Sequence, residues 1–149
     1  MLREELNEIV KTQRENILKR DKGILREKKI KITSSFCTVI SGIRRSGKST
    51  LLLQLMSKNF NYLNFEDARL TSFKIADFFK LEELFSDGVY FFDEIQNVEE
   101  WERYIRHLVD NKVKCVVTGS NASLLSRELG TKLTGRHLTT ELFPFSYSE

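Results

Sequence analysis

Hydrophobic residues recur along this chain in two different patterns, one typical of strands and one typical of helices. Short apolar runs indicate buried strands at residues 36–41, 62–65, 89–92 and 114–119, and HLTTEL at 137–142 is interpreted as a last strand. Between them, apolar residues at helical spacing predict helices at 48–58, 74–86, 99–111 and 122–129. Strands that are apolar throughout and separated by helices are typical of a parallel sheet covered on both faces. The pattern therefore predicts an α/β fold, built as a three-layer α/β/α sandwich.

The first twenty residues have a helical pattern of their own. One face carries Leu2, Leu6, Ile9, Val10, Gln13 and Ile17. Charged residues occupy most of the remaining positions, which predicts an amphipathic helix that ends near Gly23. We therefore divide the chain into an N-terminal amphipathic helix, residues 1–23, and a core, residues 24–149.

Composition narrows the class of protein. With 149 residues, 40% hydrophobic and 30% charged, the chain fits one globular domain and not a disordered or fibrous protein. No apolar run reaches the length of a membrane span and the charged start does not resemble a secretory signal, so we expect no membrane partner and a cytoplasmic location. Cys37 and Cys115 lie within apolar runs and are expected to be buried small hydrophobes.

The excess of basic residues is mild. The formal net charge is +3 and the sequence pI is near 8.9. Basic residues at 19–20 and 26–31 lack interleaved aromatics, and we interpret them as solvated surface. DNA is a partner that the sequence permits but does not indicate.

One motif carries the chemistry. Residues 42–49, GIRRSGKS, match G-x-x-x-x-G-K-[ST] between a buried strand and a helix, the context that a phosphate-binding P-loop requires. The glycines let backbone N–H groups point at phosphates, Lys48 would reach the β- and γ-phosphates, and Ser49 would coordinate Mg²⁺. The residues expected to hold the nucleotide are Gly42, Ile43, Arg44, Arg45, Ser46, Gly47, Lys48, Ser49 and Thr50. Exposed loop charges and contacts with a partner or a phosphate are both open interpretations of the two arginines.

A second acidic motif follows the strand at 89–92. Four apolar residues lead into Asp93 and Glu94, the pattern of a Walker B strand. Asp93 would orient a water ligand of the Mg²⁺ that Ser49 holds, and Glu94 would polarise the attacking water. The alternative is that both acids only cap the following helix.

Polar residues also end the next strand at the same expected edge. Ser120 or Asn121 could touch the γ-phosphate or the lytic water, the role named sensor 1, or could cap helix 122–129. Arg136 precedes the last strand; it is either a solvated cation or an arginine finger that neutralises transition-state charge.

Together these segments resemble a prokaryotic family of AAA+-type ATPases related to the signal-transduction ATPases. The resemblance rests on GIRRSGKS at 42–49, YLNFEDARL at 62–70, FFDEIQNVEEWE at 91–102, TGSNASLL at 118–125 and GRHLTTELFPFSYSE at 135–149. It covers about residues 14 to 149. Phe92 departs from the leucine that is common before the aspartate.

The resemblance implies a five-stranded P-loop sheet in the order 5-1-4-3-2, with ATP and Mg²⁺ as cofactors. It supports Ser120 or Asn121 as sensor 1 and Arg136 as a finger acting in trans within a homo-oligomer. It also implies that this chain is the N-terminal ATPase part of a longer protein, whose C-terminal domain resembles nuclease folds.

Several functions remain in competition. The first is an ATPase coupled to a remodelling or DNA-related task, and the second is a slow or non-hydrolysing ATP-dependent switch. A GTPase is disfavoured, because NKVK at 111–114 lacks the aspartate that would hold guanine. A helicase, suggested by DEIQ at 93–96, is disfavoured because the chain is too short for two motor lobes.

Overall fold

The computed structural model describes residues 1–20, 30–42, 47–56, 59–120 and 137–142, with Ser49 and residues 137–142 described by their backbone alone. The strands are β1 (Cys37–Gly42), β2 (Phe60–Asn64), β3 (Val89–Asp93), β4 (Cys115–Gly119) and β5 (His137–Leu142). The α-helices are α1 (Arg3–Leu18), α2 (Lys48–Leu55), α3 (Phe78–Leu84) and α4 (Trp101–Asp110). Three 3₁₀ turns, η1 (Ala68–Leu70), η2 (Ile75–Asp77) and η3 (Ile95–Asn97), lie in the connections.

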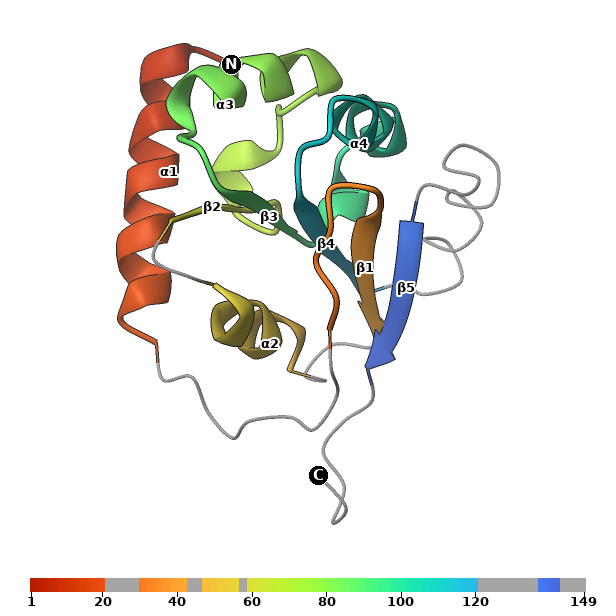
Figure 1. The fold of residues 1–149 in the computed structure, drawn as a ribbon. Coiled ribbons are helices and arrows are strands. Elements are labelled where there is room, and N and C mark those ends of the chain that lie inside the picture. The colour runs from red at the N-terminus through yellow and green to blue at the C-terminus, as the bar shows by residue number, and fades with distance from the viewer. Residues whose placement is uncertain (21–29, 43–46, 57–58, 121–136, 143–149) are drawn as a thin grey trace.

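The strands form one sheet in the order β2-β3-β4-β1-β5, and each neighbouring pair is parallel. This confirms the α/β sandwich expected from the apolar pattern and the order 5-1-4-3-2 implied by the resemblance. Figure 1 shows α2 on one side of the sheet and α3 with α4 on the other. Parallel strands place all their carboxyl ends at one edge, and that edge is where the motifs converge.

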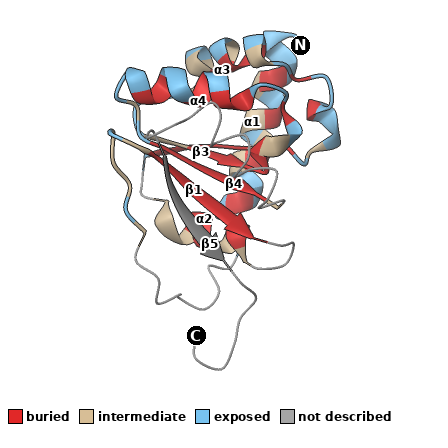
Figure 2. Ribbon diagram, turned by 90° about the vertical axis from the view of Figure 1, so that its right-hand side faces the viewer, coloured by how far each residue is buried: buried red, intermediate tan, exposed pale blue. Residues whose placement is uncertain are grey.

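Two clusters of buried side chains lie on the two faces of the sheet. One joins the sheet to α3 and α4 and includes Phe78, Phe92, Trp101 and Tyr104. The second joins the sheet to α2 through Leu51, Leu52 and Leu53. Figure 2 shows buried residues along β1, β3 and β4, with the exposed residues of α3 and α4 turned outward. Burial on both faces explains why these strands read as continuous apolar runs.

Helix α1 covers the edge strand β2. Its buried residues Leu6 and Ile9 belong to one cluster and Ile17 to the other, so the helix spans both faces at this edge. Gln13 accepts a hydrogen bond from the backbone N–H of Asn64 at 2.7 Å and donates to the carbonyl of Asn64 at 3.1 Å. An edge strand otherwise presents unpaired backbone groups, and this glutamine satisfies both groups of one residue.

Arg14 covers the other end of the same edge strand. Its guanidinium donates to the carbonyl of Phe60 at 2.6 Å and lies 4.1 Å from the centre of the Phe60 ring. The described part of the helix expected at residues 1–23, α1, therefore packs on the sheet; it begins at Arg3 and ends at Leu18, and the expected end near Gly23 lies outside the described residues.

The structure departs from the predicted elements at several ends. The helix expected at 74–86 is divided into η2 and α3, because the Asp77 carboxylate accepts a hydrogen bond from the backbone N–H of Lys74 and tightens the first turn. Leu2, expected on the buried face, precedes α1 and is 63% exposed. The helix expected at 122–129 lies outside the described residues.

Cys37 and Cys115 are both fully buried, as their apolar surroundings predicted. Burial, followed by a hydrogen bond with Cys115, raises the pKa of the Cys37 thiol. Within the part of the chain that the structure describes, no helix combines the length and the apolar character needed to cross a bilayer.

Candidate functional site

The polar residues singled out in the sequence meet at the carboxyl edge of the three central strands. Strand β1 ends at Gly42, β3 at Asp93, and β4 at Gly119, just before Ser120. Strand β4 lies between the other two, so the P-loop strand and the acidic strand flank it. Topology alone thus places residues that are far apart in the chain side by side.

Gly47 and Lys48 form the start of the helix after β1. Gly47 has φ +89°, a left-handed conformation that a residue without Cβ adopts without strain, and it is the N-cap of α2. Because glycine offers no capping side chain, the first N–H groups of α2 point out of the helix end, which suits an anion.

The Lys48 side chain turns back over the sheet edge. Its ammonium donates a 2.8 Å hydrogen bond to the carbonyl of Gly42 and lies 3.7 Å from Oε1 of Glu94. The residue is only 5% exposed. A buried ammonium needs such partners. They hold the Lys48 ammonium beside Gly42, the first residue of the motif that is expected to bind phosphates.

Asp93 is fully buried and is held from both sides. The Thr118 hydroxyl on β4 donates to Oδ1 at 2.5 Å, and the Tyr62 hydroxyl on β2 donates to Oδ2 at 2.9 Å. Burial, followed by the negative charge of Asp93, raises the pKa of Tyr62, so the phenol keeps its proton. The two flanking strands therefore set the orientation of this carboxylate.

Glu94 occupies a sharp turn directly after β3. Its φ of +55° and ψ of +49° are left-handed, a conformation that costs a non-glycine residue of order 1–3 kcal/mol. The backbone N–H of Glu94 donates to the Thr118 hydroxyl at 2.9 Å, which fixes the turn against β4. Such strain is found mostly where the local geometry serves a site.

The Glu94 carboxylate faces three polar partners. Ser120 Oγ lies 2.6 Å from both carboxylate oxygens and can donate its single proton to either. Gln96 Nε2 donates to Oε2 at 2.8 Å, and Lys48 lies near Oε1. Glu94 is the N-cap of η3 but its side chain makes no capping hydrogen bond there. Capping is therefore not the role of this side chain in the structure.

The structure describes some of the remaining expected site residues and leaves others outside the described ranges. Ser49 and Thr50 lie in the first turn of α2, where the expected ligands of Mg²⁺ and phosphate belong. The expected residues that lie outside the described ranges are Ile43, Arg44, Arg45, Ser46, Asn121 and Arg136. Of the two sensor 1 candidates, the structure brings Ser120 to Glu94.

Three contacting residues had no assigned role in the sequence. Tyr62 and Thr118 hold Asp93, and Gln96 holds Glu94. Alternation within β2 and β4 would place the first two on the same sheet face as Asp93, but only once the strand register is known. Gln96 follows Glu94 by two residues, and no spacing rule marks it.

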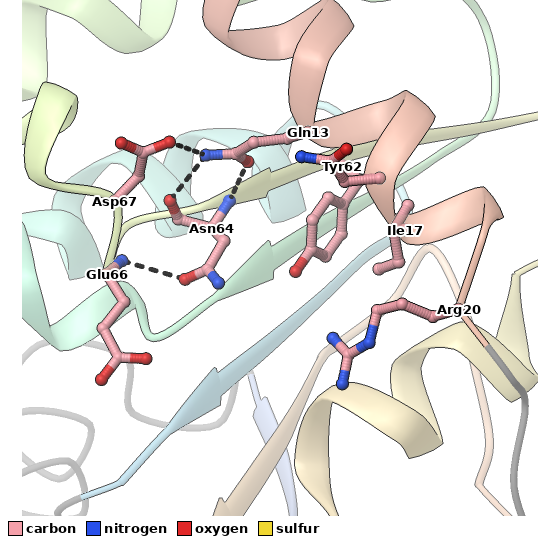
Figure 3. Close-up of a pocket in the computed structure, with 8 residues that line it drawn as sticks. Gln13, Ile17, Arg20, Tyr62, Asn64, Glu66 and Asp67 are labelled. Atoms are coloured by element: carbon pink, nitrogen blue, oxygen red, sulfur yellow. Dashed lines mark hydrogen bonds between the residues drawn. The ribbon is translucent and has the colours of Figure 1, made fainter.

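A pocket of about 620 Å³ adjoins this edge beneath the end of α1. Figure 3 shows Tyr62, Ile17 and Arg20 along one side and the hydrogen bonds among Gln13, Asn64 and Asp67 on the other. Asp67 accepts hydrogen bonds from Arg69, which are the first cause of its lowered pKa. Tyr62 lines this pocket and also donates its hydroxyl hydrogen bond to Asp93.

The donor set suits a divalent cation with phosphates. Asp93 and Glu94 supply two buried carboxylates at one edge, close to the buried ammonium of Lys48. Mg²⁺ takes oxygen ligands in near-octahedral geometry and is usually bound through one or two carboxylates together with substrate phosphates. The side chains present therefore fit a magnesium–phosphate group.

Two curated proteins are similar to this chain in sequence. The chain is 38% identical over 144 residues to an uncharacterised protein of Methanocaldococcus jannaschii, covering 89% of this chain and 32% of the relative. It is 43% identical over 132 residues to an uncharacterised protein of Haemophilus influenzae, covering 78% and 33%. The chain thus spans about a third of the length of these relatives.

A solved structure shares the fold. The Walker-type ATPase of Pyrococcus abyssi superposes with a TM-score of 0.52 at 19% identity, over 75% of this chain and 50% of that one. The family model described as AAA domain matches residues 34–149, the segment that carries every motif discussed above. With the P-loop strand, the acidic strand and the polar end of β4 at one sheet edge, this chain belongs to the AAA-domain family, a family of nucleotide-binding P-loop ATPases.

Proposed function

We propose that this domain binds ATP with Mg²⁺ at the carboxyl edge of the sheet and hydrolyses it. The observation that carries the proposal is the meeting of Lys48, Glu94 and Ser120 from three separate elements within hydrogen-bond or ion-pair distance. Phosphoryl transfer requires mainly positioning and charge stabilisation, so a fixed cation and a fixed base are its chief needs.

Each side chain has a distinct task in this proposal. Lys48 and the N–H groups at the start of α2 bind the β- and γ-phosphates. Ser49 and Asp93 hold the Mg²⁺ and its water ligands, and the bound cation neutralises charge on the phosphates. Glu94 orients and polarises the attacking water, while Ser120 holds the Glu94 carboxylate and senses the γ-phosphate.

One observation supports a second candidate, a slow ATP-dependent switch. Both carboxylate oxygens of Glu94 already accept hydrogen bonds, from Ser120 and Gln96, and Lys48 lies 3.7 Å away. A base engaged in this way exchanges its partners before it can hold a water. Turnover would then be slow unless a partner or a neighbouring subunit rearranges Glu94.

The wider role is also a proposal. We infer a remodelling or DNA-related task, and a homo-oligomer in which Arg136 acts in trans, from the family resemblance alone. The same resemblance supports a C-terminal domain in the longer protein.

Phosphate release with ATP and Mg²⁺ tests the proposal, beside ATP binding measured by fluorescence of a labelled nucleotide. Glu94→Gln should bind ATP but lose turnover by at least a hundredfold, and Lys48→Ala should lose binding as well. Glu99→Gln and Lys114→Ala, both at exposed positions, serve as matched controls and should keep the wild-type rate.

The outcomes separate the candidates. Turnover in the wild type that Glu94→Gln abolishes supports the hydrolase. Tight, Mg²⁺-dependent binding with no turnover in any variant supports the switch. Absence of ATP binding by the wild type would refute both.

A further inference from the structure

Asp93 owes its orientation in part to a residue on the outermost strand. Strands β2 and β3 pair with Tyr62 opposite Phe91 and Asn64 opposite Asp93. Because side chains alternate along a strand, Tyr62 and Asp93 lie on the same face of the sheet, one diagonal step apart. A tyrosine ring has the length to bridge that step, and its hydroxyl reaches Oδ2 of Asp93 at 2.9 Å.

The surroundings of Tyr62 leave the ring little freedom. It is 5% exposed and packs in the cluster that includes Ile17 of α1, Leu52 of α2 and Phe91 of β3. A side chain held on several sides places its hydroxyl accurately, because core side chains sit in close-packed rotamers. The donor to Asp93 is therefore preorganised by the core and not by solvent.

Tyr62 and Thr118 act on Asp93 from opposite strands. The hydroxyl of Thr118 on β4 donates to Oδ1 of Asp93, and the hydroxyl of Tyr62 on β2 donates to Oδ2. Because a donor lies at each oxygen, the plane of this fully buried carboxylate cannot rotate without breaking a hydrogen bond. Groups that orient a metal-binding carboxylate in this way typically affect metal affinity or activity by about 10–100-fold.

We propose that Tyr62 is a positioning residue for Asp93, and that it sets the Mg²⁺ affinity of the nucleotide complex. This inference rests on the proposed function, since it assumes that Asp93 serves the magnesium ion. Tyr62 acts only through Asp93. Its loss should therefore change magnesium-dependent binding and leave nucleotide binding without magnesium unchanged.

The test is Tyr62→Phe, which removes one oxygen and keeps the ring. Binding of fluorescent ATP is titrated with Mg²⁺ and, separately, in EDTA. The Mg²⁺ concentration for half-maximal tight binding should rise about tenfold, with ATP affinity in EDTA unchanged within twofold. Tyr104→Phe is the matched control, because Tyr104 is equally buried and its hydroxyl donates to Glu82, away from the edge. This control should show the wild-type Mg²⁺ dependence.

A double-mutant comparison guards against a purely structural effect. In the Asp93→Asn background, adding Tyr62→Phe should produce no further change in Mg²⁺ dependence, because the residue acts through the carboxylate. Melting temperatures of all variants are measured, and binding is compared below the lowest of them. A wild-type Mg²⁺ dependence in Tyr62→Phe would overturn the role of Tyr62 and leave the proposed function standing. A wild type without magnesium-dependent ATP binding would overturn both.

Discussion

The ammonium of Lys48 lies 3.7 Å from Oε1 of Glu94, and the two residues are only 5% and 8% exposed. Lys48 begins α2, which follows β1 along the chain, and Glu94 lies in the turn that follows β3; these two strands are separated in the sheet by β4. A buried ion pair is stabilising only when further hydrogen bonds satisfy both charged groups. Here Gly42 accepts a hydrogen bond from Lys48, and Ser120 and Gln96 donate hydrogen bonds to Glu94. The cation proposed for phosphate and the base proposed for water are thus part of one network.

That network predicts a kinetic role for Ser120. In Ser120→Ala, Glu94 keeps Gln96 and Lys48 but loses its 2.6 Å donor, so its carboxylate becomes less fixed. We expect turnover to fall about tenfold or more, with ATP affinity changed less than threefold, as steady-state phosphate release and nucleotide titration would measure. Ser72→Ala, at an exposed position, is the control. Unchanged turnover in Ser120→Ala would argue that Ser120 only ends the strand.

Helix α1 should contribute to stability through one buried amide. Gln13→Ala leaves the backbone N–H and carbonyl of Asn64 without the partner they have in the structure. Removing one partner of a buried hydrogen bond costs about 1–3 kcal/mol, which we expect as the loss in free energy of unfolding. Urea denaturation measures it, with exposed Asn16→Ala on the same helix as control. Equal stability of the two variants would contradict the anchoring role of Gln13.

The lowered pKa of Asp67 predicts that the free energy of unfolding depends on pH. Hydrogen bonds from Arg69 hold the pKa of Asp67 below its ordinary value of 3.8, so the folded state binds the proton less well than the unfolded state. The resulting stabilisation is present at neutral pH and is lost as the pH falls below about 3.8 toward the folded pKa.

Asp67→Asn should therefore be less stable than the wild type at pH 7, and the gap should narrow at pH 3. Urea denaturation at both values, at constant ionic strength, is the measurement. Glu66→Gln at the neighbouring exposed position is the comparison. A gap that stays constant with pH would show that the charge of Asp67 is not the cause.

The backbone conformation at Gly88 predicts that a side chain at this position lowers the stability of the domain. Its φ is +135°, and a Cβ added there would lie 2.6 Å from the carbonyl oxygen of Asn59. Gly88→Ala should therefore destabilise the domain by more than about 1 kcal/mol, because both strain and a backbone clash oppose it. Thermal and urea unfolding would measure the loss, with Ser86→Ala as the exposed neighbouring control. A neutral Gly88→Ala would mean that the turn before β3 relaxes readily.

Local patterns in the sequence were enough to predict the strands of the sheet and the residues that form the candidate site. Mainly apolar runs predicted β1 to β4 to within two residues at their ends, because strands buried on both faces leave few polar positions, and β5 was predicted with its observed ends. The P-loop pattern and the acids after β3 were readable because each depends on residues close together in the chain. The order of the strands followed from family resemblance and not from the pattern.

The side-chain contacts between neighbouring strands became visible only in the folded arrangement. Tyr62 reads as one more aromatic residue of a buried strand, and its contact with Asp93 exists because β2 and β3 pair in one register. The same holds for Thr118, which lies beside Asp93 through the pairing of β3 with β4. In the sequence, Gln13 is a polar residue within an otherwise apolar helix face. In the structure, its amide oxygen accepts a hydrogen bond from the backbone N–H of Asn64 on the edge strand β2. A single sequence encodes these contacts through packing over long range, and local periodicity does not contain that information.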